Sequence, residues 1–434
     1  MLIAADEDRQ AREVRRQVAR RRSALVDAWN LSDELVLVGA GSPVPIPGRR
    51  DRTYPFRAHL EYLYLTDRER PGGVLAYDPK EGWVDFVTPV TRQERLWEGA
   101  VDDESIDTTP IDELPGWLER RGGRPLAILG ATFDRAPAHD EALAEQLRRE
   151  LNALRRAKDE LEIERMRFAE RATAAGFAKL VELIEPGRTE RQLQVELEAE
   201  FFRHGADDVA FDTIVAGGPN AAVLHFRPTR RELQAGELVL VDAGAEYRGY
   251  DSDVTRTYPA SGEFAPEQRE LHTIVRRALA TATERCLPGA EFRDVHRSAQ
   301  LVIAEGLADV GLLRGTPESL VESEAVSVFF PHGIGHLVGL GIRDASEALP
   351  GRERDEFPRL RLDLPLRPGY VTTIEPGIYL VPALVHDAEF RAKHPREVNW
   401  DLAEAMIGFG GIRIENDVLV TADGYEVLTA DVPV

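Results

Sequence analysis

The sequence is poor in cysteine, since Cys286 is the only one among 434 residues. A single cysteine can form neither an intramolecular disulfide nor a cysteine-based metal site. The sequence also lacks any apolar run of the length that a membrane span needs. Its opening, MLIAADED, is too acidic for a transit peptide and has no apolar signal-peptide core. These absences predict a soluble, cytoplasmic protein with no membrane partner.

Positive charge is scarce as well. The 76 acidic residues outnumber the 54 lysines and arginines, which gives a formal net charge of −22. The sequence has no basic patch of the size that nucleic-acid binding needs. Its one basic run, from Arg9 to Arg22, is typical of the solvated face of an N-terminal helix. We therefore expect no nucleic-acid partner, and small molecules or metal ions are better candidates.

The length and the globular mixture, 43% hydrophobic and 30% charged, predict two domains. The segments LVLVGAG, GGVLAYD, WVDFVTPV and PLAILG predict the strands of a smaller α/β domain over residues 1–155. A long amphipathic pattern after Lys158 and a capping box at Thr189 predict two helices at the start of a second domain, residues 156–434. There ELVLVDAG, VTTIEPGIYL and other strand patterns alternate with helices, which predicts an α+β domain on an antiparallel sheet. The polar insert at 382–406 is its least structured-looking part.

Aspartates occur close together in the segment VDAGAEYRGYDSDVTRT, which predicts a β-hairpin. A turn at Tyr247 and Arg248 would place Asp242 opposite Asp253, with Cβ atoms roughly 5 Å apart. Two carboxylates at that distance repel each other unless one is protonated or a cation lies between them. Asp251 would point to the same face as Asp253, which favours a bound cation over a merely solvated hairpin.

Two glutamates interrupt apolar strand patterns, Glu375 in VTTIEPGIYL and Glu415 in GGIRIENDVLV. Acids in such runs are seldom buried unless they are paired or bind a metal. The tripeptide EPG also occurs at Glu185, where it follows a helix and is an ordinary helix end, so the strand context carries the signal. Arg413 would lie on the same strand face as Glu415, either contributing to a site or forming a simple ion pair with Glu415.

Two histidines lie four residues apart in PHGIGHLVGLGIRD. The glycines around His332 and His336 favour a loop or strand over a helix, so we expect one of the two to bind metal and the other to contact substrate. His225, in GPNAAVLHF, is a weaker candidate. Four carboxylates and one imidazole suit catalytic manganese, cobalt or zinc. Four acids exceed what one ion normally takes, so we predict two ions roughly 3.5–4 Å apart, bridged by carboxylates and a hydroxide, for metal-assisted hydrolysis.

Together these segments resemble the pita-bread metallopeptidases, in particular the proline-specific branch with aminopeptidase P and prolidase. VDAGAEYRGYDSDVTRTYP, HGIGHLVGL, IEPGIY and GIRIEND occur in the family's order. The resemblance implies a C-terminal pita-bread (creatinase/aminopeptidase) domain and Glu375 as general base. It places His225 and His332 on the substrate side and Arg413 where it helps to hold the substrate. The metal ligands that it implies are Asp242, Asp253, His336, Glu375 and Glu415.

The N-terminal segments RRRSALVDAW and YPFRAHLEYLYLTD resemble the N-terminal domain of aminopeptidase P, which helps to shape the active-site mouth. The resemblance implies short proline-containing peptides as substrates, two divalent ions with Mn²⁺ as first choice and Co²⁺ or Zn²⁺ as alternatives, and a homodimer or homotetramer. It favours an Xaa-Pro aminopeptidase, and an Xaa-Pro dipeptidase (prolidase) is the alternative.

One position departs from both groups. The seventh residue after His336 is normally a histidine, and here it is Arg343. Arginine only donates hydrogen bonds. It could stabilise an oxyanion or bind a substrate carboxylate, or it could turn aside to pair with Asp344 or Glu347 and leave a catalytically altered family member.

Two further hypotheses belong to other classes of protein. The chain could use the fold as a binding or scaffolding module, or it could be a metal-free, creatinase-like enzyme. Neither has a physical use for four clustered acids, which repel one another without a metal. The metal content of the purified protein would separate both from the two-metal hydrolase.

Overall fold

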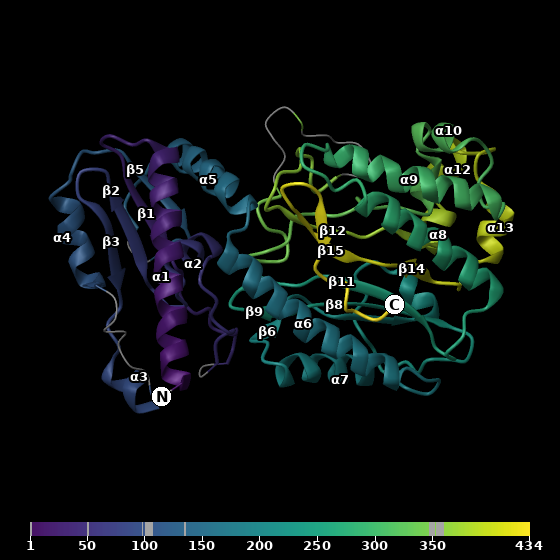
Figure 1. The fold of residues 1–434 in the computed structure, drawn as a ribbon, viewed down its shortest axis with the longest axis horizontal. Coiled ribbons are helices and arrows are strands. Elements are labelled where there is room, and N and C mark those ends of the chain that lie inside the picture. Colours follow the sequence, from purple (N-terminus) through teal and green to yellow (C-terminus); the bar gives the residue numbers. More distant parts are fainter. Residues whose placement is uncertain are drawn as a thin grey trace. The chain divides into compact units, whose positions relative to one another are not determined.

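The chain folds into two compact units, Met1–Arg155 and Arg156–Val434, which Figure 1 shows as ribbons coloured along the sequence. The computed structural model describes residues 2–49, 52–97, 99, 107–133, 136–346, 352 and 360–434. Among the helices in these ranges, none combines the length and the apolar composition that crossing a membrane requires.

The first unit is an α/β fold around a mixed sheet with the strand order β4-β3-β2-β1-β5. Strand β1 pairs antiparallel with β2 and parallel with β5, so Leu37 lies opposite both Ala76 and Ile128. All five residues of β1 are buried, and the strand is paired with a neighbouring strand along both of its edges. The elements are α1 (Leu2–Trp29), β1 (Leu35–Gly39), α2 (Leu60–Thr66), β2 (Val74–Asp78), β3 (Gly82–Val87), α3 (Arg92–Trp97), β4 (Thr109–Pro110), η1 (Ile111–Glu113), α4 (Leu114–Glu119), β5 (Leu126–Gly130) and α5 (Glu141–Arg156).

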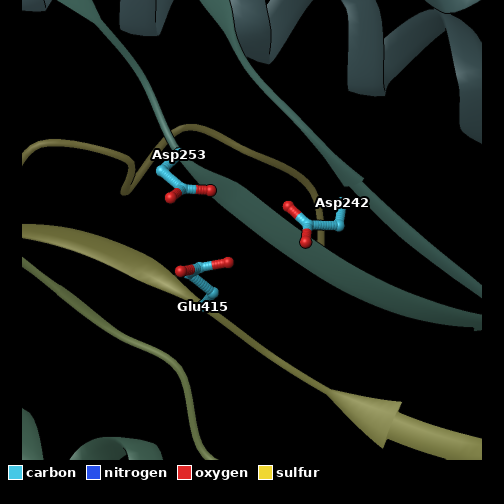
Figure 2. A group of neighbouring side chains, drawn as sticks. All are labelled: Asp242, Asp253 and Glu415. Carbon is cyan, nitrogen blue, oxygen red and sulfur yellow. The ribbon is translucent and has the colours of Figure 1, made fainter. Parts of the chain in front are cut away.

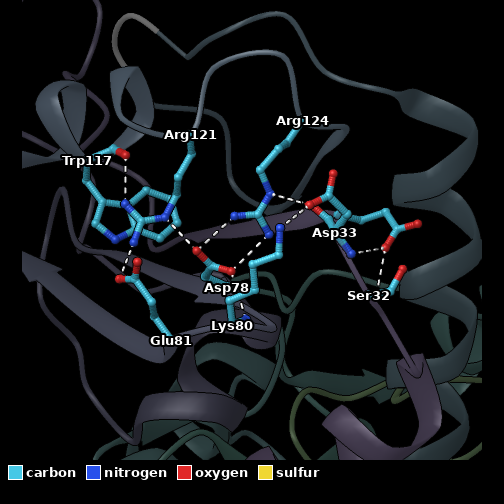
Figure 3. A network of polar contacts seen from close by, with 9 residues as sticks. Ser32, Asp33, Asp78, Lys80, Glu81, Trp117, Arg121 and Arg124 are labelled. Atoms are coloured by element: carbon cyan, nitrogen blue, oxygen red, sulfur yellow. Dashed lines mark hydrogen bonds and ion pairs between the residues drawn. The ribbon is translucent and has the colours of Figure 1, made fainter.

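In this unit, a network of ion pairs surrounds Asp78, the last residue of β2 (Figure 3). Asp78 is 1% exposed and accepts hydrogen bonds from Arg121 Nε at 2.6 Å and from both Nη atoms of Arg124 at 2.9 Å. The guanidinium of Arg121 also lies 3.9 Å from the centroid of the Trp117 ring. The hydrogen bonds from Arg124 are the main reason that the pKa of Asp78 is held far below its usual range. The two arginines thus neutralise this acid within the fold.

The described residues of the second unit form four small antiparallel sheets, in the orders β10-β9-β6, β11-β8-β7, β12-β15-β16 and β13-β14. Its helices are α6 (Glu160–Leu183), α7 (Glu190–Arg203), η2 (Gly218–Ala222), α8 (Pro266–Thr283), α9 (Phe292–Asp309), α10 (Pro317–Glu322), η3 (Ala325–Val328), α11 (Pro382–Val385), α12 (Ala388–Lys393) and α13 (Trp400–Ala405). Its strands are β6 (Asp208–Val209), β7 (Ile214–Gly217), β8 (Leu238–Ala243), β9 (Ala245–Tyr247), β10 (Tyr250–Asp251), β11 (Val254–Pro259), β12 (Val371–Ile374), β13 (Gly377–Tyr379), β14 (Gly411–Arg413), β15 (Asn416–Val420) and β16 (Tyr425–Val427).

Two pairs of helices cover these sheets from opposite sides (Figure 1). Helices α6 and α7 pack Phe177 and Leu197 against Val241 of β8. Helices α8 and α9 bury Ile274 and other apolar residues in a larger core with Val418 of β15. The predicted α+β architecture is therefore confirmed. The strands between the two helix layers carry the acidic residues singled out in the sequence.

The hairpin formed by β9 and β10 differs from the predicted one in register. Tyr247 pairs with Tyr250, so the turn lies at Arg248 and Gly249. Both turn residues have positive φ, 54° and 81°. A two-residue turn of this kind requires positive φ at both central positions, which glycine adopts far more easily than tyrosine. The prediction of a turn at Tyr247 and Arg248 is wrong for this reason.

The insert at 382–406 is more ordered than predicted, since it holds the short helices α11, α12 and α13. Asp387 caps α12, and its Oδ1 accepts hydrogen bonds from the amides of Glu389 and Phe390, both at 2.9 Å. Helices of four to six residues show too little apolar periodicity to be recognised in a sequence.

Candidate metal centre

Three buried carboxylates from separate segments meet in the second unit. Asp242 lies near the end of β8, Asp253 directly precedes β11, and Glu415 joins β14 to β15. Each offers an oxygen that lies within 4.8 Å of the oxygens of the other two. Figure 2 shows the three carboxyl groups turned toward one another. Asp251 on β10 is buried but does not belong to this group.

The pairing of β8 with β11 does not by itself bring Asp242 and Asp253 together. Asp242 pairs with Thr255, and Asp253 lies outside the strand. A close crossing of the chain does so instead, because a Cβ on Gly244 would lie only 1.7 Å from the carbonyl oxygen of Ser252. Glycine at 244 therefore allows the segment before β11 to cross close to the end of β8.

Hydrogen bonds position the backbone of Asp253 and the carboxyl groups of Glu415 and Asp242. The amide of Asp253 donates a hydrogen bond to Asp417 Oδ2 at 2.9 Å, and Glu415 Oε2 accepts one from Thr255 Oγ1 at 2.6 Å. Asp242 Oδ2 accepts one from Arg413 Nη2 at 2.5 Å. Arg413 thus pairs with Asp242, whereas the sequence suggested Glu415 as its ion-pair partner.

The electrostatic surroundings of these acids are unfavourable to their charge. Burial, followed by the charges of Glu415 and Asp242, raises the pKa of Asp253 well above its usual range. Burial and the charges of Glu375 and Asp242 do the same to the pKa of Glu415. Among the residues that the structure describes, none donates a hydrogen bond to the buried Oδ1 of Asp242. The group is short of positive charge at its centre.

His336 is buried beside the acids, with Nε2 3.5 Å from Asp253 Oδ2. Its Nδ1 lies 3.1 Å from the carbonyl oxygen of Leu337. A carbonyl only accepts, so Nδ1 carries the proton and Nε2 presents a lone pair toward the carboxylates. Burial lowers the pKa of His336 to about 4. The imidazole is therefore neutral at pH 7, the form that binds a metal ion.

A chain of hydrogen bonds connects Arg413 to the second histidine. Arg413 Nη1 donates to Tyr379 Oη at 2.8 Å, and Tyr379 Oη lies 2.9 Å from His332 Nε2. His332 Nδ1 lies 2.9 Å from the Gly333 carbonyl oxygen, so Nδ1 donates and Nε2 accepts. Burial and the charge of Arg413 lower the pKa of His332 to about 3, which keeps this ring neutral.

Glu375 lies between β12 and β13, with its amide bonded to the Ile334 carbonyl oxygen at 2.8 Å. Its Oε2 is 3.6 Å from His332 Nδ1, and its side chain is 17% exposed. The pKa of Glu375 is raised to about 7, mainly by burial. The charge of Arg413 opposes this rise, and the charge of Asp242 adds to it. Glu375 therefore interacts electrostatically with the acids of the cluster, although it does not belong to the group of three whose oxygens lie within 4.8 Å of one another.

His225 and Arg343, the two remaining predicted site residues, are exposed. Neither forms a hydrogen bond or ion pair with another residue in the described part of the chain. Asp344, one of the two partners suggested for Arg343, pairs instead with Lys158. The other, Glu347, lies outside the described residues.

The segment that follows His336 is anchored by the start of the second unit. Lys158 Nζ lies 3.1 Å from Asp344 Oδ2, and both side chains are fully buried. Arg156 Nε donates a hydrogen bond to the Ala345 carbonyl oxygen at 3.0 Å. The pair lies directly against the chain at Gly339, where a Cβ would come within 2.2 Å of Lys158 Cε.

Two residues at the centre carry no signal in the sequence that would predict a role there. Tyr379 connects Arg413 to His332, and the apolar surroundings of IYL gave no sign of a polar role. Arg361 is exposed, yet its charge contributes to lowering the pKa of His332, His336 and Glu375. Its position in the arginine-rich stretch RLRLDLPLR gave no indication of which arginine faces the site.

Comparison with known proteins identifies the fold and the family. Residues 164–422 match the model for metallopeptidase family M24, and residues 18–108 match the aminopeptidase P N-terminal domain. A probable Xaa-Pro aminopeptidase of Penicillium rubens is 33% identical over 87% of this chain and 81% of its own length. Another, of Talaromyces stipitatus, is 34% identical over 90% of this chain and 84% of its own.

Solved structures agree with these relatives. Pseudomonas aeruginosa aminopeptidase PepP superposes with a TM-score of 0.78 at 30% identity, over 96% of this chain and 95% of that one. A zinc-substituted Escherichia coli aminopeptidase P in complex with product gives 0.78 at 28% identity, over 96% of both chains. The predicted pita-bread domain and the aminopeptidase-P-like N-terminal domain are both confirmed. The chain belongs to metallopeptidase family M24.

Proposed function

We propose that this metallopeptidase is an Xaa-Pro aminopeptidase, which removes the first residue from peptides whose second residue is proline. The observation that carries the proposal is the mutual approach of three buried carboxylates in a family M24 fold whose relatives bear that name. We assign the metal ligands as Asp242, Asp253, His336, Glu375 and Glu415.

The residues present fit a pair of divalent cations. The acids raise one another's pKa, the buried Oδ1 of Asp242 has no donor among the described residues, and a neutral imidazole turns its lone pair toward them. Each feature is costly without a cation and favourable with one. Divalent ions held there would supply Lewis-acid activation of a water molecule and of the scissile carbonyl.

The side chains around the ions have separate tasks in this proposal. Glu375 can accept a proton from water at a carboxylate oxygen and return it to the departing amine. Arg413 fixes Asp242 through Nη2 and Tyr379 through Nη1. Tyr379 in turn orients His332, which we assign to hydrogen bonding with the substrate, as we do the exposed His225.

The decisive experiment is peptide cleavage by the purified protein with added Mn²⁺. We expect release of the first residue from Xaa-Pro-Xaa peptides and none from matched Xaa-Ala-Xaa peptides. Glu375→Gln should abolish release. Glu185→Gln, in the second EPG tripeptide and 62% exposed, should leave it unchanged. No release from any Xaa-Pro-Xaa peptide would contradict the proposal, and release from Xaa-Pro dipeptides alone would establish a prolidase instead.

The choice of metal, the location and the assembly are finer parts of the proposal. We propose Mn²⁺ ahead of Co²⁺ or Zn²⁺, a cytoplasmic location, and a homodimer or homotetramer. The support is the family resemblance for the metal and the assembly, and the composition of the sequence for the location. Activity after reconstitution with each metal, and the mass of the protein in solution, would test the first and the last.

A further inference from the structure

Glu190, at the start of α7, is a fully buried acid outside the metal centre. Its carboxylate accepts four hydrogen bonds, all from the segment 217–229. Oε1 accepts from the Gly217 amide at 3.0 Å and from Asn220 Nδ2 at 2.7 Å. Oε2 accepts from the Thr229 amide at 3.0 Å and from Thr229 Oγ1 at 2.6 Å. One carboxylate therefore ties both ends of this segment to the helix.

The tied segment carries His225, which is exposed between two residues that pack inward. Leu224 and Phe226 pack against the apolar cluster that contains Tyr379. Tyr379 is the residue that connects Arg413 to His332. The two residues next to His225 thus pack against a cluster that includes Tyr379, a member of the hydrogen-bonded series Arg413–Tyr379–His332.

The same segment is also in close contact with the strand that carries Arg413. A Cβ on Gly410 would lie 2.1 Å from the Gly218 carbonyl oxygen, and one on Gly411 would lie 2.6 Å from the Ala221 carbonyl oxygen. The backbone of η2 therefore lies directly on the start of β14, with no room for a side chain between them. Contact with β14 thus fixes one side of η2, while Glu190 holds the two ends of the segment that carries His225.

We infer that Glu190 is a positioning residue for the reaction, which holds the segment 217–229 so that His225 faces the substrate. The inference rests on the proposed function, because it gives His225 a substrate-side role. The chemistry requires a carboxylate, since all four partners donate and only an ionised acid accepts at both oxygens. A glutamine would direct its NH₂ at one pair of donors, so one end of the segment would be released whichever way the amide turns.

The test compares Glu190→Gln with Glu196→Gln, an exposed acid on the same helix. We expect Glu190→Gln to lower kcat/KM for Xaa-Pro-Xaa peptides about tenfold, mainly through KM, and Glu196→Gln to leave it unchanged. In a double-mutant cycle with His225→Ala, the double variant should be no worse than His225→Ala alone. A purely structural role would lower activity by the same factor in both backgrounds, and this outcome would overturn the inference.

Hydrogen–deuterium exchange gives a readout that needs no catalysis. Exchange over the segment 217–229 should be faster in Glu190→Gln than in the parent or in Glu196→Gln. Unchanged exchange would overturn the inference. A parent that cleaves no Xaa-Pro peptide would overturn the proposed function, and exchange would then still decide whether Glu190 holds the segment.

Discussion

Two buried aspartates, one in each unit, have opposite surroundings. Asp78 is 1% exposed and Asp253 5% exposed. Asp78 faces two arginines, whose hydrogen bonds hold its pKa far below the usual range. Asp253 faces Glu415 and Asp242, and burial together with these charges raises its pKa far above that range.

The difference separates an acid that is paired within the fold from an acid that we propose to be a metal ligand. Asp78 has its counter-charges in the chain and needs nothing more (Figure 3). The cluster in Figure 2 lacks them at its centre, so ionising all three acids carries an electrostatic cost that a bound cation would remove. A cluster of buried acids that raise one another's pKa is typical of functional sites.

The strongest test of this contrast is to neutralise Asp253. We expect Asp253→Asn to lower kcat/KM for Xaa-Pro-Xaa peptides by about a thousandfold or more, because a ligand oxygen and its charge are lost. Metal analysis should show fewer than two equivalents per chain. A variant with full metal content and activity would remove Asp253 from the centre.

Neutralising Asp78 should lower the stability of the fold and leave the metal content unchanged. Asp78→Ala leaves two largely buried guanidinium groups without their carboxylate, and we expect it to lower the free energy of unfolding by about 3 kcal/mol. Chemical denaturation would measure the loss, and two metal equivalents should remain. Asp33→Ala, at a side chain that is 50% exposed, is the matched control and should change stability by under about 0.5 kcal/mol. A drop in metal content with Asp78→Ala would contradict the division of roles.

The two kinds of acid should also respond to pH with opposite signs. The pKa of Glu375 is raised from about 4.3 in an unfolded chain to about 7. The folded state therefore favours the protonated form of Glu375. The contribution of this group to the free energy of unfolding is complete below about pH 4 and is lost as the pH rises through 7. The pKa of Asp78 is lowered, so its effect is present above about pH 4 and lost as the pH falls below that.

Differences between parent and variant isolate each acid from the buried histidines, which titrate in the same range. In protein stripped of metal, Glu375→Gln should equal the parent in stability near pH 4 and exceed it by on the order of 3–4 kcal/mol at pH 8. Asp78→Asn should be less stable than the parent above about pH 4, and this deficit should shrink as the pH falls further. Thermal unfolding in the presence of a chelator would measure both, and differences of the same sign would contradict the comparison.

The smallest expected effect concerns Arg343. Arg343→His removes an exposed donor that can bind a substrate carboxylate with two hydrogen bonds. We expect KM for dipeptides and tripeptides with a free C-terminus to rise about five- to tenfold, and KM for C-terminally amidated peptides to stay the same. An equal change for both would show that the arginine does not bind the carboxylate. A large gain in kcat for all of them would show that the arginine marks reduced catalysis.

Patterns that depend on neighbouring residues could be predicted from the sequence. The main strands, the helices from 160 to 203 and the unusual context of Glu375 and Glu415 are of this kind, and the motif order indicated the family. The hairpin register could not be predicted, because it depends on positive φ at Arg248, a residue type that rarely adopts it. Tyr379 was missed because its polar role depends on Arg413, which is 34 positions away in the sequence.

The anchoring of the segment after His336 bears on how the catalytic part could be produced alone. The family match begins at residue 164, but Arg156 and Lys158 lie before it and hold Ala345 and Asp344. The amide of Lys158 also donates to the Gly369 carbonyl oxygen at 2.8 Å, just before β12. A fragment cut at the family boundary would leave Asp344 buried without its lysine. An excised peptidase domain must therefore begin no later than Arg156.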